Sequence, residues 1–129
     1  MAGEKVLIVD DDKEITMLLE FIMKKEGYST LVAHNGEDGV KISLEEKPDI
    51  LLLDLMMPGI DGFQVCEKLK SEESTRGIPI IMLTALGMGK DFEKGLESGA
   101  DWYITKPFES NHLVKRVRYL LDSKKKGTF

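Results

Sequence analysis

Five short β-rich segments alternate with amphipathic segments along this chain. Residues 6–9 form a continuous apolar run in which three of the four side chains are β-branched. Short continuous apolar runs are typical of strands buried on both faces of a parallel sheet. We expect five strands, over residues 6–9, 28–33, 50–53, 78–83 and 102–105.

Apolar residues recur at helical spacing between these strands. Ile15, Leu18, Leu19 and Ile22 are spaced i, i+3, i+4 and i+7, which predicts one face of a helix over residues 13–26. Further helices are expected over residues 36–47, 62–70 and 87–99, and from about residue 110 onward. The pattern over residues 87–99 is the weakest of these, because glycine lowers helix propensity.

The second predicted helix places Val40 and Leu44 on one face. Strict strand–helix alternation predicts an α/β fold with a single doubly wound, five-stranded parallel sheet and helices on both faces. Right-handed crossovers leave few topologies, and the order 2-1-3-4-5 of flavodoxin-like folds is the common five-stranded choice. We expect one domain over residues 1–122, followed by a basic C-terminal tail or the start of a linker over residues 123–129.

Composition limits the function classes. The chain has 129 residues, 42% of them hydrophobic, and a formal net charge of −5. An acidic domain is poorly suited to bind nucleic acid by itself, since phosphate binding needs a basic face. No segment is apolar over the ~20 residues that cross a bilayer, and the single cysteine, Cys66, excludes an internal disulfide framework. We therefore expect a cytoplasmic protein without membrane contact.

Polar residues follow the predicted strands where each one ends. Asp10 and Asp11 follow the first strand, Asp54 the third, Thr84 the fourth and Lys106 the fifth. Ligands of open α/β sheets bind beyond the carboxyl ends of the strands, near the point where the strand order reverses. In the order 2-1-3-4-5 that point lies between strands one and three. The sequence therefore brings three carboxylates, a hydroxyl and an ammonium to one edge.

These residue types together favour phosphoryl chemistry. Clustered carboxylates raise each other's pKa, and a hard divalent cation such as Mg²⁺ relieves the repulsion. Asp54, with a cation on one side and Lys106 on the other, would then act as a nucleophile that forms an aspartyl phosphate. Each residue alone is better explained as a turn, cap or surface residue, and Asp12 is assigned to the cap of the first helix.

Four segments of the chain, residues 6–12, 53–62, 81–85 and 99–108, resemble the motifs of one family. In order and at this spacing, they are similar to the receiver domains of two-component response regulators over about residues 5–122. The resemblance implies that Asp54 accepts a phosphoryl group. It also implies that Asp11 binds Mg²⁺ directly, Asp10 largely through water, and the Met56 backbone carbonyl completes the protein ligands. Mn²⁺ is an alternative metal.

The resemblance assigns further roles around the fifth strand. Lys106 would contact the phosphoryl oxygens, and the Lys106–Pro107 peptide bond would be cis. Thr84 and Tyr103 match the family's switch positions, where the hydroxyl moves towards the phosphoryl group and the aromatic ring follows. The face formed by the fourth helix, the fifth strand and the fifth helix would then change shape. Trp102 is either packed against a neighbouring helix or an aromatic anchor on this face.

The implied partners are proteins. A sensor histidine kinase or a histidine phosphotransfer protein would supply the phosphoryl group, and a downstream protein or a fused output domain would bind the switched face. Phosphorylation-dependent homodimers are also compatible with the resemblance. The chain would stand alone or belong to a longer regulator or hybrid kinase.

Phosphoryl lifetime depends on positions that follow Asp54 and Thr84. By resemblance, Met56, Ala85 and Leu86 control access to the phosphoryl group and its hydrolysis. The apolar side chains of Met56 and Leu86 cannot position an attacking water. We therefore expect a fairly long-lived phosphoryl form.

Two other functions are weaker readings of the same residues. A haloacid-dehalogenase-like phosphatase needs a second aspartate two residues after its nucleophile, and Met56 stands there. A nucleotide-binding domain needs a glycine-rich loop after the first strand, where this chain has aspartates. We therefore expect a switch that catalyses only its own phosphorylation and dephosphorylation.

Overall fold

The computed structural model describes residues 3–85 and 98–125 of the chain. Its strands are β1 (Lys5–Val9), β2 (Ser29–Ala33), β3 (Ile50–Asp54), β4 (Ile80–Ala85) and β5 (Trp102–Lys106). The helices within the described ranges are α1 (Lys13–Lys25), α2 (Gly36–Glu46), α3 (Gly62–Ser71) and α5 (Ser110–Lys125). The helix predicted over residues 87–99 lies almost entirely outside the described residues.

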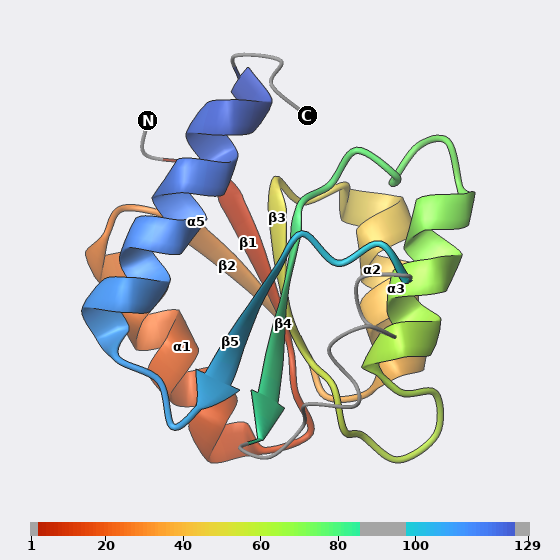
Figure 1. The fold of residues 1–129 in the computed structure, drawn as a ribbon, viewed down its shortest axis with the longest axis horizontal. Helices are drawn as coiled ribbons and strands as arrows, with labels where there is room; N and C mark the ends of the chain where they lie inside the picture. The colour runs from red at the N-terminus through yellow and green to blue at the C-terminus, as the bar shows by residue number, and fades with distance from the viewer. Residues whose placement is uncertain (1–2, 86–97, 126–129) are drawn as a thin grey trace.

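The strands form one parallel sheet in the order β2-β1-β3-β4-β5, as predicted from the sequence. Figure 1 shows α1 and α5 on one face of the sheet and α2 and α3 on the other. Because every strand runs in the same direction, all carboxyl ends lie at one edge, towards which the arrowheads of β4 and β5 point. The polar residues singled out above lie at this edge: Asp10 and Asp11 follow β1, and Asp54, Thr84 and Lys106 lie at or near the last positions of β3, β4 and β5.

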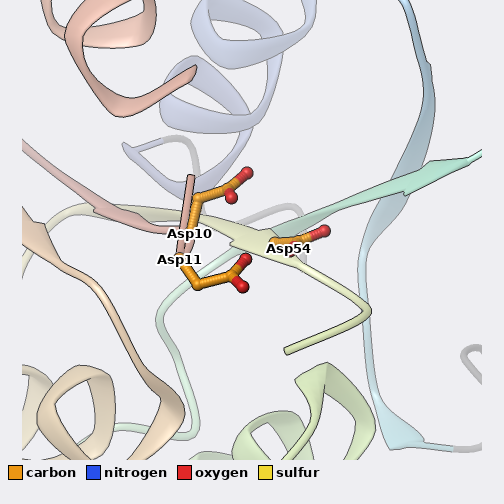
Figure 2. A group of neighbouring side chains, drawn as sticks. All are labelled: Asp10, Asp11 and Asp54. Atoms are coloured by element: carbon orange, nitrogen blue, oxygen red, sulfur yellow. The ribbon is translucent and has the colours of Figure 1, made fainter. Parts of the chain in front are cut away.

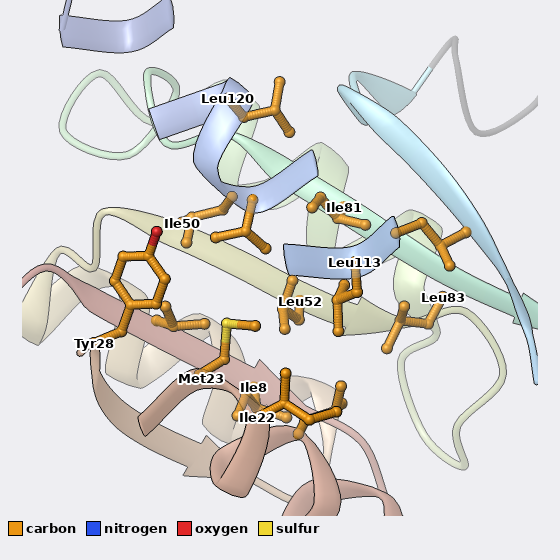
Figure 3. Close-up of a cluster of buried hydrophobic side chains, with 14 of the residues drawn as sticks. Ile8, Ile22, Met23, Tyr28, Ile50, Leu52, Ile81, Leu83, Leu113 and Leu120 are labelled. Atoms are coloured by element: carbon orange, nitrogen blue, oxygen red, sulfur yellow. The ribbon is translucent and has the colours of Figure 1, made fainter. Parts of the chain in front are cut away.

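The core consists of two clusters, one on each face of the sheet. Alternate residues of a strand point to opposite faces, so Val6 and Ile8 pack beneath α1 and α5, while Leu7 and Val9 pack beneath α2 and α3. Figure 3 shows the first cluster, in which Leu113 and Leu120 of α5 meet strand residues. Burial on both faces explains why the strand segments are continuously apolar.

Side-chain caps fix the starts of the helices next to the sheet edge. Asp12 caps α1, as predicted, and its Oδ1 accepts hydrogen bonds from the backbone N–H groups of Glu14 (2.9 Å) and Ile15 (3.3 Å). Asp61 and Gln64 form a reciprocal capping box at the start of α3. The caps hold the loops that follow β1 and β3 against the sheet.

Two residues of the predicted apolar helix faces are exposed rather than buried. Leu18 of α1 is 46% exposed and Leu44 of α2 is 38% exposed. The buried side of α1 is shifted towards Thr16, Leu19, Ile22 and Met23. Helical spacing selects a face of the helix, but the width of the covered stripe depends on how close the neighbouring elements lie.

The fourth strand begins later than predicted. The backbone N–H of Ile78 donates to the Thr75 carbonyl, so this residue belongs to a turn, and Pro79 has no N–H to donate to a sheet. Strand pairing with β3 starts at Ile80. Within the described residues, no helix has both the length and the apolar character needed to cross a bilayer.

Candidate functional site

Three carboxylates meet at the carboxyl edge of the sheet. Asp10 and Asp11 follow β1, and Asp54 is the last residue of the adjacent strand β3. One carboxylate oxygen from each residue lies within 4.8 Å of the other two. Figure 2 shows the three side chains extending to the same side. The parallel pairing of β1 with β3 therefore gathers residues that are more than forty positions apart in the sequence.

The three carboxylates differ in their exposure to solvent. Asp10 and Asp54 are 1% and 6% exposed, whereas Asp11 is exposed. A buried carboxylate is stable only when it is paired, hydrogen-bonded or bound to a metal. The cluster thus combines two buried acids with a third that is open to solvent.

Lys106, the last residue of β5, supplies the neighbouring positive charge. Its Nζ donates hydrogen bonds to Asp10 Oδ2 at 2.8 Å and to Asp54 Oδ1 at 3.1 Å. The same ammonium therefore joins the ends of β1, β3 and β5. The Lys106–Pro107 peptide bond is cis.

The site shifts the pKa values of its acid and its base. Burial, with the negative charge of Asp10, raises the pKa of Asp54 from 3.8 to about 6, although Lys106 and hydrogen bonding from the Met56 backbone act in the opposite direction. Burial pulls the pKa of Lys106 down, but the hydrogen bond to Asp10 and the charge of Asp54 outweigh it and leave the pKa raised. Lys106 thus stays protonated, while Asp54 has less favourable surroundings for its charge.

Two contacts that hold Asp10 in place were missed by the sequence analysis. The backbone N–H of Asp12 donates to Asp10 Oδ1 at 2.9 Å, so the residue assigned to helix capping also orients the cluster. His34 follows β2, and its Nδ1 lies 3.2 Å from the Asp10 backbone oxygen. The sequence did offer one signal for His34: it directly follows β2, which is the neighbour of β1, and so lies at the same carboxyl edge of the sheet.

Gly62 allows α3 to start directly against the end of β3. A Cβ atom at this position would lie 2.7 Å from the Asp54 carbonyl oxygen and 2.8 Å from Leu55 Cα. Both distances are shorter than real Cβ contacts. Glycine at this position therefore permits the tight loop that presents Asp54.

The two predicted switch residues lie outside this cluster, on β4 and β5. Thr84 is buried near the carboxyl end of β4, one residue beyond the Asp54–Leu83 pair. Tyr103 lies on β5 opposite Met82 and packs against the core on the side of α2 and α3.

The positions assigned to phosphoryl hydrolysis are only partly described. The Met56 side chain is 64% exposed. β4 ends at Ala85, whose side chain is not described, and Leu86 lies outside the described residues. Of these three positions, only Met56 has a described side chain.

The carboxylate cluster fits a hard divalent cation. Mg²⁺ takes oxygen ligands and is usually held by one or two carboxylates together with water and phosphate oxygens. Asp10, Asp11 and Asp54 offer oxygens only, and they lie close enough to share one ion. A carboxylate beside a cation and an ammonium is also equipped to attack an electrophilic phosphorus atom.

Comparisons with known proteins agree with this arrangement. The family model for the response regulator receiver domain matches residues 6–118. The receiver domain of a signal transduction histidine kinase from Syntrophus aciditrophicus has 36% identity and a TM-score of 0.88, with 94% of this chain and 92% of that chain covered. A CheY-like receiver domain protein from Methanospirillum hungatei has 28% identity and a TM-score of 0.91, with coverages of 98% and 99%.

One similar structure contains the metal that the acidic cluster fits. The receiver domain of a sensor histidine kinase from Pseudomonas aeruginosa has magnesium coordinated in its active-site cleft. It is 28% identical to this chain, with a TM-score of 0.88 over 95% of this chain and 100% of that one.

Proposed function

Because the chain belongs to the response regulator receiver family, we propose that it accepts a phosphoryl group on Asp54 in a Mg²⁺-dependent reaction. The observation that carries this proposal is the cluster of Asp10, Asp11 and Asp54 with Lys106 bridging two of the three acids. The donor is a phosphohistidine on a sensor kinase or on a phosphotransfer protein.

Asp54 is the residue of the cluster suited to be the nucleophile. It ends a central strand and pairs with Leu83 of β4, so its backbone is fixed by the sheet, while Asp10 and Asp11 lie after the end of β1. One carboxylate oxygen forms the new bond to phosphorus as the P–N bond of the donor breaks. Asp54 must be ionised to react, and although its pKa is raised to about 6, the carboxyl group is still largely ionised at pH 7 and above.

The other residues hold charge in place around the transferred group. Asp10 and Asp11, with the Met56 backbone carbonyl, are the proposed magnesium ligands beside Asp54, and Mn²⁺ has similar ligand preferences. Bound Mg²⁺ would supply positive charge that offsets the carboxylates and the phosphoryl oxygens. Lys106, already within hydrogen-bonding distance of Asp54, would form a charge-assisted contact with the new phosphoryl group.

We further propose that phosphorylation is read out on the face built on β5 and α5. A phosphoryl group adds about −1.5 to −2 charge and strong acceptor oxygens. The Thr84 hydroxyl, at the neighbouring strand end, would donate to one of these oxygens. Tyr103 on the adjacent strand would then occupy space that Thr84 leaves. A downstream protein or a fused output domain would bind the altered face.

This function makes the chain a switch that modifies itself rather than an enzyme with turnover. Met56 stands where an aspartyl-phosphate phosphatase would need an acid, and it cannot donate a proton. Turnover of phosphate esters by the purified chain would favour the phosphatase. We place the reaction in the cytoplasm, where kinases have access to ATP and where the free thiol of Cys66 stays reduced.

Incubation with acetyl phosphate and Mg²⁺ tests the proposal. We expect intact-mass spectrometry to show a gain of one phosphoryl group, which is absent in Asp54→Asn and after chelation of the metal. Asp12→Asn is the matched control, because asparagine also caps helices and the variant keeps the backbone N–H that contacts Asp10. Phosphorylation of Asp54→Asn to the wild-type extent would refute the assignment of the nucleophile.

A further inference from the structure

A basic and aromatic surface lies on β5 and α5, apart from the carboxylate cluster. His112, Lys115, Arg116 and Tyr119 are spaced i, i+3, i+4 and i+7, so they share one side of α5. They line a surface pocket of about 310 Å³. Trp102, at the start of β5, lies beside Arg116. We call these five residues the basic–aromatic surface.

Arg116 lies over the ring of Trp102 and near that of Tyr119. Its guanidinium carbon lies 3.7 Å from the centroid of Trp102 and 5.3 Å from that of Tyr119. Both rings remain accessible, with Trp102 39% and Tyr119 59% exposed. Stacking on an aromatic face orients a guanidinium group, while its N–H donors still point outward in the plane of the guanidinium itself. The surface therefore presents a cation whose position is already fixed.

This cation has no acidic partner in the part of the chain that the structure describes. Arg116 Nε is buried and makes no hydrogen bond among residues 3–85 and 98–125. Neither Arg116 nor Lys115 forms an ion pair within the same ranges. By contrast, Arg118 on the same helix is paired with Glu26 at 3.4 Å. The positive charges of Arg116 and Lys115 are thus not neutralised by any acidic residue of the described ranges.

The charge around this surface is opposite to that of the whole chain. Helix α5 has five lysine or arginine residues against one aspartate, whereas the chain has a net charge of −5. A long polyanion such as nucleic acid would extend beyond this patch over the rest of a chain whose net charge is also negative. A short acidic ligand would cover the patch alone. The accessible rings of Trp102 and Tyr119 add apolar area that a phosphate backbone would not use.

We propose that the basic–aromatic surface binds an acidic segment of a partner protein. Carboxylates of the segment would pair with Arg116 and Lys115, and an apolar side chain would cover Trp102 and Tyr119. This rests on the proposed function, because it specifies the chemistry of the partner that binds the face built on β5 and α5. The patch is built from side chains of α5 and β5 and does not include Asp54, so we expect the unphosphorylated protein to bind the segment as well.

The tryptophan provides a site-specific reporter for the test. Trp102 is the single tryptophan of the chain, so its fluorescence and its indole N–H signal in NMR spectra report on this surface. The probe is a short synthetic peptide of glutamate and leucine, compared with the same peptide carrying glutamine for glutamate. We expect saturable changes at Trp102 with the acidic peptide only, and weaker binding as salt is raised.

Charge-removing variants on α5 locate the binding site. We expect Arg116→Gln and Lys115→Gln each to weaken binding about tenfold, the size expected for loss of a charge-assisted contact. Arg118→Gln is the matched control, with the same change on the same helix, and it should bind as the wild type does. If thermal unfolding shows that Arg116→Gln is not folded, Lys115→Gln, an exposed position, carries the test alone.

Several results would overturn the proposal. These are equal binding of the glutamine peptide, equal weakening by Arg118→Gln, or tighter binding of a single-stranded oligonucleotide. A Trp102 signal that depends on protein concentration without peptide would instead indicate a second copy of the chain. Two comparisons separate the two proposals. Normal peptide binding by Asp54→Asn, which lacks the phosphoryl acceptor, leaves the docking site standing, whereas a wild-type protein that is phosphorylated but does not bind the peptide removes the docking site alone.

Discussion

Asp54→Asn should stabilise the metal-free protein at pH 8. The ionised Asp54 carboxylate is 6% exposed and lies near the charge of Asp10, and both conditions disfavour its charged form. Lys106 offsets only part of this effect. Asparagine has nearly the shape of a protonated aspartate but no charge, so the substitution removes the repulsion and the desolvation together.

The raised pKa gives the size of the effect. A pKa of about 6 in the folded state, against 3.8 for the ordinary group, corresponds to about 3 kcal/mol of destabilisation by the ionised carboxylate. Below pH 3.8 the group is protonated in both states and the penalty is absent. The penalty grows as the pH rises and is complete above about pH 6. At pH 5 about half of this destabilisation remains, by the linkage between the pKa shift and stability.

Urea unfolding in the presence of a chelator measures this difference. We expect a higher midpoint for Asp54→Asn than for the wild type at pH 8, with an unchanged slope, and a smaller gap at pH 5. Asp122→Asn, an exposed aspartate on α5, is the control and should unfold like the wild type at both pH values. Mg²⁺ should reduce or reverse this difference in urea midpoint, because a ligand that binds the folded wild type stabilises the folded state.

A less stable Asp54→Asn variant at pH 8 without metal would refute this reasoning. It would mean that the contact between Lys106 and Asp54 stabilises the folded protein by more than the burial of Asp54 and its repulsion from Asp10 destabilise it. A gap that is the same at pH 5 and pH 8 would show that the charge of Asp54 is not its cause.

Three further substitutions have defined outcomes. Lys106→Ala should raise the pKa of Asp54 above about 6, because the positive charge that lowers it is lost; a carbon NMR titration that shows a lower pKa would contradict this. Met56→Asn should shorten the phosphoryl lifetime, since an amide can orient water, and faster loss from the wild type would refute it. Gly62→Ala should destabilise the fold by about 1–3 kcal/mol through overpacking, whereas Gly77→Ala, whose added Cβ meets nothing within 4 Å, should not.

The order of the strands could be predicted because it follows from local patterns. Alternation of apolar runs with helical spacing leaves few parallel topologies, and the observed order is the expected one. The exposure of Leu18 and Leu44 could not be predicted in this way. Each lies at the border of an apolar stripe, where burial is decided by the distance to the next helix rather than by the sequence of its own helix.

The gathering of the site residues could be predicted from strand ends, but their contacts could not. Placing Asp10 and Asp54 at one edge needs only the topology. The two hydrogen bonds from Lys106 depend on how a long side chain crosses the edge from β5. The stacking of Arg116 on Trp102 was also beyond the sequence, since it depends on how α5 packs over β5.

A crystal structure with Mg²⁺ and beryllofluoride, a mimic of the phosphoryl group, is the most direct test of a metal-assisted aspartyl phosphate at this edge. We expect metal density in contact with the carboxylates of Asp11 and Asp54, with Asp10 beside the metal directly or through a water molecule, beryllofluoride on Asp54, and Lys106 Nζ against a fluorine atom. A structure that shows no metal there, with the Asp54 side chain turned away from the other two acids, would contradict it.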